Sequence, residues 1–115
     1  MTLSIYHNPR CSKSRQTLQL LEEHGMTPQV INYLETPPDA PTLGALLDML
    51  GMEPRELMRK KEKDYRASGA DDPGLSRDQL IELMVRTPRL IERPIVVCNG
   101  RAAIGRPPER VLEIL

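Results

Sequence analysis

Residues 7–15, HNPRCSKSR, join a predicted strand to a predicted helix, and the rest of the chain is arranged around this junction. Thr2–Tyr6 alternates polar and apolar side chains, as a half-buried strand does, and Pro9 interrupts the strand pattern. From about Cys11 the pattern becomes that of an amphipathic helix, which Gly25 can end and whose apolar positions are Leu18, Leu20 and Leu21. We therefore expect a strand, a short loop and a helix that opens at a cysteine.

Cys11 has the sequence surroundings of a reactive thiol. A helix N-terminus directs free backbone N–H groups and a positive dipole at the sulfur, and Arg10, Lys13 and Arg15 add positive charge. A free thiol with a pKa of about 8.5 is only slightly ionised at neutral pH, so a lowered pKa increases the amount of nucleophile. The alternative is a buried, inert cysteine at a strand end. That reading suits an apolar neighbourhood, whereas this one is polar and cationic.

The composition indicates one ordinary domain without a general affinity for polyanions. The chain has 115 residues, and its 16 basic residues balance its 16 acidic ones. Nothing global therefore favours nucleic acid or an anionic membrane as a partner. Three Tyr and no Phe or Trp also leave few platforms for stacking bases.

The two cysteines give no disulfide framework. Cys98 closes an apolar strand and is interpreted as a core residue rather than a resolving thiol. The sequence shows no signal peptide and no long apolar run. We therefore expect a soluble protein of the reducing cytoplasm, with no metal site and no membrane partner.

The middle of the chain is predicted to be mostly helical. Gln29–Leu34 resembles a second strand, parallel to the first, and the proline-containing segment Glu35–Pro41 is expected to be a loop. Leucines then recur at helical spacing up to Gly51, and Pro54 can start another helix to about Arg59. After a charged run and a loop, Ser76 and Gln79 form a capping box for a helix that ends at Thr87-Pro88.

A hairpin and a last helix are predicted at the C-terminal end. Ile95–Cys98 and Ala102–Ile104 flank Asn99-Gly100, a dipeptide typical of a type I′ turn. Pro107-Pro108 then opens a helix whose apolar face is assigned to Val111, Leu112 and Leu115. The order β-α-β, helical insertion over about 42–88, β-β-α predicts an α/β fold: one thioredoxin-like domain over 1–115 with a mixed sheet of about four strands.

Three local strings, in this order of elements, resemble the arsenate reductases of the glutaredoxin-coupled type. They are YHNP at 6–9 before Cys11 with Ser14-Arg15 after it, IERPIVV at 91–97, and RP at 106–107. Weaker matches are YLE at 33–35 and LMRK at 57–60. The similarity therefore covers essentially the whole chain.

The resemblance implies a thioredoxin-like fold and a thiol-dependent enzyme. It implies that Cys11 attacks arsenate to form a covalent adduct, which glutathione as co-substrate and glutaredoxin as partner resolve to arsenite, with no bound cofactor. It also implies oxyanion binding by Arg59, Arg93 and Arg106, and support around the thiolate by His7, Ser14 and Arg15. The Arg93-Pro94 peptide bond is then expected to be cis, turning the backbone towards Cys11.

Some of these residues have plainer explanations. His7 could simply form a hydrogen bond at a strand end, and Arg59 lies in a charged run of the kind that usually forms a solvated surface. Ser14 could be an ordinary residue of the first helical turn, and we interpret Thr17 in that way. Arg10, Ser12 and Lys13 are more polar or charged than the resemblance leads us to expect, and they could tighten anion binding or favour another substrate.

Other thiol chemistries also use a cysteine at such a position. A tyrosine phosphatase needs an arginine six residues after the cysteine, but position 17 is Thr. A Cys-x-x-Cys oxidoreductase is disfavoured because Ser14 replaces the second sulfur. Two alternatives stay open: a thiol-redox regulator that binds RNA polymerase, and a glutathione-dependent reductase or deglutathionylase with another substrate.

Overall fold

The computed structural model describes residues 2–115, which form two compact units. Unit 1 comprises the chain up to Thr36 together with Arg93–Leu115, and unit 2 is Pro37–Glu92. Unit 2 covers the region of the predicted helical insertion, while a single domain over the whole chain stays a prediction. No helix among residues 2–115 is long and apolar enough to cross a membrane.

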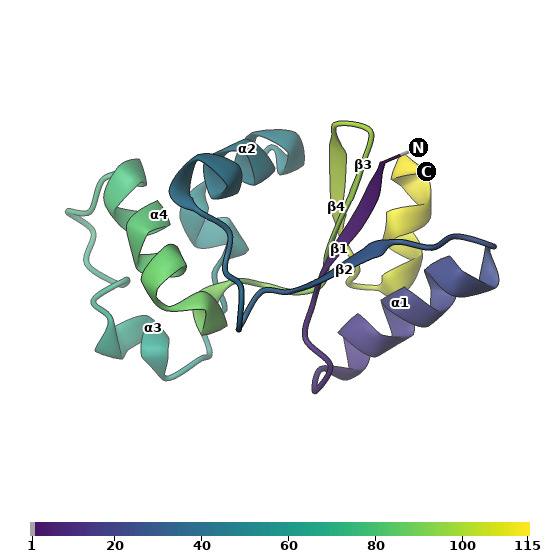
Figure 1. Cartoon of the computed structure of the whole chain (residues 1–115). Coiled ribbons are helices and arrows are strands. Elements are labelled where there is room, and N and C mark those ends of the chain that lie inside the picture. The colour runs from purple at the N-terminus through teal and green to yellow at the C-terminus, as the bar shows by residue number, and fades with distance from the viewer. Residues whose placement is uncertain (1) are drawn as a thin grey trace. The chain divides into compact units, whose positions relative to one another are not determined.

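Unit 1 is built on a four-stranded mixed sheet with the strand order β2-β1-β3-β4 (Figure 1). β1 (Leu3–His7) pairs in parallel with β2 (Gln29–Asn32) and antiparallel with β3 (Ile95–Cys98), which pairs antiparallel with β4 (Arg101–Ile104). Parallel neighbours need a crossover connection, and α1 (Ser12–Glu23) supplies it. The predicted α/β fold class and strand arrangement are confirmed.

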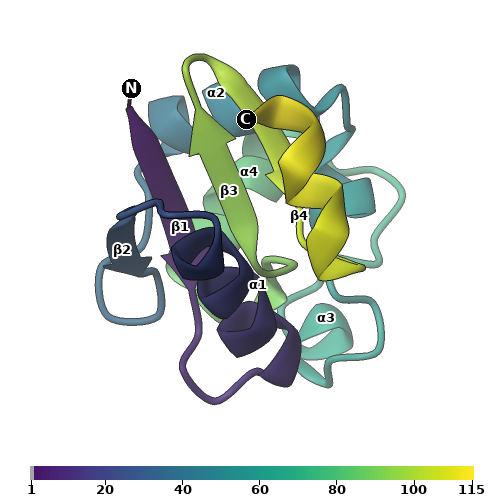
Figure 2. The ribbon, with the colours of Figure 1, turned by 90° about the vertical axis from the view of Figure 1, so that its right-hand side faces the viewer.

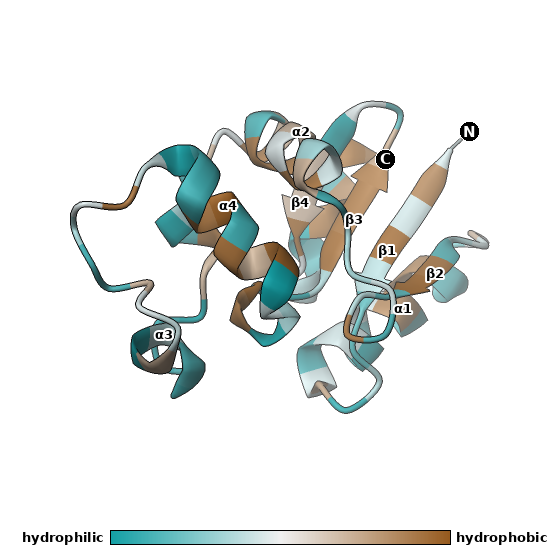
Figure 3. Cartoon of the chain, turned by 60° about the vertical axis from the view of Figure 1, so that its left-hand side comes forward, coloured by the Kyte–Doolittle hydropathy of each residue, from teal (hydrophilic) through white to brown (hydrophobic). Residues whose placement is uncertain are grey.

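Two helices cover one face of this sheet. Figure 2 shows α1 beside the C-terminal 3₁₀ helix η3 (Pro108–Ile114), with the strands behind them. Apolar and more polar residues alternate along β1, visible as bands in Figure 3, so that every second side chain enters the core. The core of unit 1 buries Leu3, Ile5, Leu21, Val96, Cys98, Val111 and Ile114.

The C-terminal helix differs from the prediction. The predicted apolar face contains Leu115, but Leu115 is 38% exposed, whereas Val111 and Ile114 are buried. A 3₁₀ helix has three residues per turn, so residues three apart share a face. Pro108, Val111 and Ile114 follow that spacing and form the buried side of η3. The α-helical period assigned to this segment was therefore wrong.

Unit 2 is helical. α2 (Ala40–Leu50) packs against α4 (Arg77–Arg86). The predicted Ser76–Gln79 capping box is confirmed, with both of its hydrogen bonds present. The buried residues of these two helices are Leu43, Leu46 and Leu47, and Leu80, Ile81 and Met84.

Three elements of unit 2 depart from the expected boundaries. The helix predicted over Pro54–Arg59 is a 3₁₀ turn, η1 (Pro54–Leu57), because Met58 is extended and pairs with Ile91. A short helix, α3 (Asp64–Ala67), begins at the last residue of the charged run and ends at the first residue of the predicted loop. α2 begins at Ala40, before the predicted end of the loop, because the Asp39 side chain caps it. A second 3₁₀ turn, η2 (Pro88–Leu90), follows α4.

The turn between β3 and β4 has the predicted chemistry. Asn99 and Gly100 have φ angles of 50° and 79°. Both central residues of a type I′ turn need positive φ, which Asn and Gly adopt most easily. This hairpin returns the chain to Gly105 and Arg106 at the end of β4.

We predict that Gly105→Ala destabilises the protein by about 1–3 kcal/mol, because it overpacks a buried site. A Cβ at Gly105 would lie 2.8 Å from Pro94 Cγ and 3.1 Å from Thr17 Cγ2, and closer still to Thr17 Oγ1. Denaturant unfolding measures the effect.

The matched control is Gly44→Ala in α2, where the new Cβ would meet only Ile81 Cδ1, at 3.9 Å. That variant should gain about 0.5–1 kcal/mol, since Ala is the better helix former. A Gly105→Ala protein as stable as the wild type would mean that the three segments meeting at Gly105 are loosely packed.

Candidate active site

The register of the sheet brings three chain segments of unit 1 to one end of the strands. Tyr6 near the end of β1 pairs with Ile95 at the start of β3, and Ile95 pairs with Ile104 at the end of β4. Cys11 follows β1, while Arg93 shortly precedes β3 and Arg106 shortly follows β4. Residues far apart in the sequence therefore meet at the same edge.

The loop after β1 holds Cys11 at the N-terminus of α1. The Cys11 N–H donates to Asn8 O at 3.0 Å, and the Arg10 N–H donates to the Asn8 side-chain oxygen at 3.0 Å. Cys11 is the N-cap residue of α1 and has extended backbone angles. Its sulfur therefore faces the unsatisfied N–H groups of the first helical turn.

Residue Cys11 is buried, with 8% of its surface exposed, yet the pKa of its thiol lies below the ordinary value. Burial raises the pKa, because it disfavours the charged form. Hydrogen bonds from the backbone N–H of Ser14 and from the Arg93 side chain, the charge of Arg93, and the N–H of Lys13 together outweigh burial. The site thus stabilises the thiolate relative to that of a free cysteine.

Arg93 and Arg106 both contact the sulfur. The Arg93 side chain forms a hydrogen bond with it, and Arg106 Nη2 lies 3.5 Å from Cys11 Sγ. Arg106 Nε also donates to Arg93 O at 2.8 Å, and the Gly105 N–H donates to Pro94 O at 3.0 Å. The Arg93-Pro94 bond, expected to be cis, is cis, and so is Arg106-Pro107. The two arginines are thus tied to each other as well as to Cys11.

A network of buried polar groups supports the loop between β1 and α1. Ser14 Oγ accepts from the Asn8 N–H at 3.0 Å and lies 2.6 Å from His7 Nδ1. Burial lowers the pKa of His7 from its usual value of 6.5, and the charge of Arg15 lowers it further. The lowered pKa favours the neutral imidazole at pH 7, and one hydrogen bond joins its Nδ1 to the Ser14 hydroxyl. His7 positions Ser14 rather than adding positive charge.

Two other predicted residues have defined places. Arg15 is exposed, and its Nη1 donates to Pro9 O at 2.9 Å, which braces the loop before Cys11. Cys98 is buried in the core, as predicted, and is the residue of β3 farthest along the chain from Pro94. Both cysteines are free thiols.

Arg59 lies in unit 2, where a backbone hydrogen bond and two ion pairs hold it. Its N–H donates to Leu90 O at 2.7 Å, next to the Met58–Ile91 bridge. Its side chain forms ion pairs with Glu62 at 3.3 Å and with Glu92 at 4.0 Å. Its predicted role at the oxyanion stays a prediction.

Sequence reasoning missed Thr17. We interpreted it as an ordinary helix residue, but it is fully buried, donates to Lys13 O at 2.8 Å and packs against Gly105. Ser14, Thr17 and Leu21 are the buried residues of α1. Their spacing of three and four residues was a signal of one helical face, hidden because two of the three residues are polar.

No group of three or more His, Cys, Asp or Glu residues within 2–115 is placed to hold a metal ion. The polar groups that converge on Cys11 are guanidinium and backbone N–H donors. Such donors suit an anion.

Known proteins match this chain over both units. The model of the ArsC family matches residues 6–114. A protein from Escherichia coli strain K12 named YfgD is 60% identical over 98% of this chain and 96% of its own length. An arsenate reductase of Neisseria meningitidis strain Z2491 is 46% identical over 98% of this chain and 97% of its own. The solved structure of an arsenate reductase from Vibrio cholerae has a TM-score of 0.97 and 57% identity, covering 100% of this chain and 98% of that one.

We predict that His7 makes the protein less stable in mild acid. Its pKa is lower in the folded protein, so the unfolded chain takes up the proton first, below about pH 6.5. The free energy of unfolding should therefore fall between about pH 7 and about pH 5, and His7→Asn should show a smaller fall. Urea unfolding at the two pH values measures the difference.

All other titrating groups are common to the two proteins, so the difference between their slopes isolates His7. Between about pH 7 and about pH 8 the stability difference should stay constant, because His7 is neutral in both states there. If the free energy of unfolding fell by the same amount in acid for the wild type and for His7→Asn, the assignment of a neutral, buried His7 would be contradicted.

Proposed function

The chain belongs to the ArsC family, and from this membership and the groups around Cys11 we propose that it is an arsenate reductase with Cys11 as its nucleophile. The observation that carries the proposal is the Cys11 sulfur at the N-terminus of α1, in contact with Arg93 and Arg106. The named relatives, arsenate reductases of Neisseria meningitidis and Vibrio cholerae, support the choice of substrate.

The main barrier to this reaction is the repulsion between two anions, the thiolate and arsenate, and the site reduces it. Arsenate is a tetrahedral oxyanion, and a thiolate must approach its arsenic atom against like charge. Planar guanidinium groups relieve this repulsion through paired hydrogen bonds to the oxygens. Arg93 and Arg106 already contact the sulfur, so the same two cations can hold the incoming oxyanion beside it.

Arg59 is the third oxyanion-binding arginine of the proposal. The resemblance to the family supports this assignment through the LMRK string at 57–60. In unit 2 the Arg59 backbone is fixed next to Leu90. A guanidinium on a fixed backbone loses less freedom when it binds an anion.

The proposed reaction oxidises two thiols and reduces arsenic by two electrons. The Cys11 thiolate attacks arsenate, an arsenic–sulfur bond forms, and one arsenate oxygen leaves as water after protonation. A glutathione thiolate then supplies the second sulfur. Arsenite leaves with the electron pair of the arsenic–sulfur bond, and Cys11 and glutathione remain joined as a mixed disulfide.

Glutaredoxin restores the thiolate in this scheme. Cys98 is buried in the core of unit 1, so it is poorly placed to resolve the mixed disulfide. The second reductant therefore comes from outside the chain, and glutaredoxin with glutathione acts on such disulfides. Two free thiols and a glutathione-dependent cycle suit the cytoplasm, which we propose as the location.

The experiment is arsenite production by purified protein supplied with arsenate, glutathione and glutaredoxin. Wild type and Cys98→Ser should form arsenite at similar rates, because Cys98 is buried in the core of unit 1. Cys11→Ser should form none above the background without protein. Arsenite production that survives the loss of Cys11, or that never occurs in the wild type, would remove the proposal.

The same assay separates the arginines. Arg93→Ala should raise the arsenate KM or lower kcat by about tenfold or more, as loss of a charge-assisted contact does. The matched control is Arg101→Ala, an exposed arginine at the other end of β4, which should leave both constants unchanged. Unchanged kinetics in Arg59→Ala would remove Arg59 from the site and leave the role of Cys11 intact.

A further inference from the structure

Asn8 is a buried polar residue in the loop between β1 and α1, with 8% of its surface exposed. The proposed reaction uses its neighbours His7 and Cys11 but gives Asn8 no part. A polar side chain costs free energy when it leaves water, unless its groups find hydrogen-bond partners in the protein. An amide buried beside the nucleophile is therefore expected to be held there by specific hydrogen bonds.

Three polar groups of Asn8 bond to different parts of the chain around Cys11. The side-chain Oδ1 accepts from the Arg10 N–H at 3.0 Å. The main-chain oxygen accepts from the Cys11 N–H at 3.0 Å. The Asn8 N–H donates to Ser14 Oγ at 3.0 Å, in the first turn of α1. Asn8 is thus bonded to the cysteine, to the residue before it and to the helix after it.

The side-chain bond reinforces a tight turn over residues 8–11. In such a turn the carbonyl of the first residue accepts from the N–H of the fourth, as Asn8 O does from Cys11. Asn is favoured at the first position and Pro at the second, which is Pro9 here. The Asn side chain adds a bond to the N–H two residues further on, and this bond holds the turn in one shape. Without the amide, the Arg10 N–H would lose this partner.

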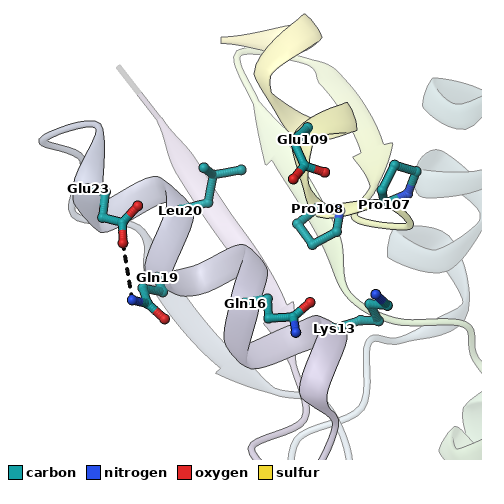
Figure 4. Close-up of a pocket in the computed structure, with 8 residues that line it drawn as sticks. All are labelled: Lys13, Gln16, Gln19, Leu20, Glu23, Pro107, Pro108 and Glu109. Atoms are coloured by element: carbon teal, nitrogen blue, oxygen red, sulfur yellow. Dashed lines mark hydrogen bonds between the residues drawn. The ribbon is translucent and has the colours of Figure 1, made fainter.

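The position of Cys11 matters because backbone groups contribute to holding its sulfur. The N–H groups of Ser14 and Lys13 bond to the sulfur. Figure 4 shows the Lys13 side chain on the groove between α1 and η3, so Lys13 serves the sulfur through its backbone. A side chain can follow a displaced partner by changing rotamer, whereas an N–H in a helix stays where the helix sets it. The loop before Cys11 must therefore bring the sulfur to these groups.

A second contact that braces this loop is the weaker one. Arg15 Nη1 donates to Pro9 O at 2.9 Å, but Arg15 is exposed. A long side chain loses much freedom when it forms such a bond, and at the surface water competes for both groups. The bond from the Arg10 N–H to Asn8 joins groups two residues apart, so it requires less ordering. The Asn8 amide is therefore the main side-chain brace of the turn.

We propose that Asn8 is a positioning residue for the Cys11 nucleophile, an inference that rests on the role of Cys11 in the proposed function. The Asn8 amide fixes the turn, the turn fixes the Cys11 backbone, and the sulfur then lies against the N–H groups of the first turn of α1. Loss of the amide shifts the sulfur relative to the helix. Asn8 thus acts on the attack by the thiolate rather than on binding of the oxyanion.

The test follows the ionisation of Cys11 in the full-length Cys98→Ser protein, where Cys11 is the only thiol. The rate of alkylation by iodoacetamide, measured as a function of pH, gives the midpoint of ionisation. Asn8→Ala should raise this midpoint by about half a unit to one unit, which corresponds to one lost N–H bond to the sulfur. Asn8→Ser keeps an oxygen that accepts from the Arg10 N–H more weakly, so its midpoint should lie between those of the parent protein and Asn8→Ala.

The matched control is Ser76→Ala, which removes a bond of the same kind in unit 2, donated by the Gln79 N–H at 3.2 Å. It should lower the free energy of unfolding and leave the Cys11 midpoint unchanged. An unchanged midpoint in Asn8→Ala would overturn the proposal, and so would equal midpoints in Asn8→Ala and Asn8→Ser. If Asn8→Ala does not fold, a raised midpoint in Asn8→Ser supports the proposal and an unchanged one overturns it.

Alkylation needs no arsenate, so the two proposals can fail separately. In the arsenite assay Asn8→Ala should lower kcat by about threefold or more and leave the arsenate KM nearly unchanged. A raised KM with unchanged kcat would overturn the positioning role. A midpoint that depends on Asn8, in a protein that forms no arsenite, would support the placing of the sulfur by Asn8 and remove the proposed function. Arsenite formation with an unchanged midpoint would overturn the positioning role and leave the function standing.

Discussion

The interaction on which the rest of unit 1 depends is the stabilisation of the Cys11 thiolate by hydrogen bonds and positive charge. Burial alone makes a thiol harder to ionise, and Cys11 is buried, so its surroundings must supply more than the burial removes. They do so with two N–H groups of the first turn of α1 and the Arg93 side chain. The register of the sheet brings these groups to Cys11, because it sets the ends of β1, β3 and β4 side by side.

Holding polar groups at this end of the core requires a particular packing. Ser14 and Thr17 occupy positions on the buried face of α1 where apolar residues would stabilise more, and each is satisfied by a hydrogen bond. Gly105 leaves out a side chain so that Thr17 and Pro94 can approach. The same contacts that fill the space also fix the backbone before Arg106. In this part of the core, the same contacts therefore determine both the packing and the geometry of the site.

Much of this could be predicted from the sequence, and the failures have physical reasons. Local signals were strong at the Asn99-Gly100 turn and the Ser76 capping box, because both depend on residues close in the chain. The buried face of α1 was misjudged at Thr17, because its partner Gly105 is distant in sequence. The C-terminal helix was given the wrong period, since an apolar pattern over one short segment does not separate α from 3₁₀ geometry. The contact of Arg93 and Arg106 with Cys11 depends on the register of three strands, which no local sequence signal gives. In the sequence, only the family resemblance pointed to these two arginines.

The most direct test of this account is a pH titration of the Cys11 thiolate by its ultraviolet absorbance in the Cys98→Ser protein, where it is the only thiol. The midpoint should lie below that of free cysteine titrated under the same conditions, and Arg93→Ala should move it upward, because the lost guanidinium stabilised the anion. A midpoint at or above that of free cysteine, or one that Arg93→Ala leaves in place, would contradict the central claim.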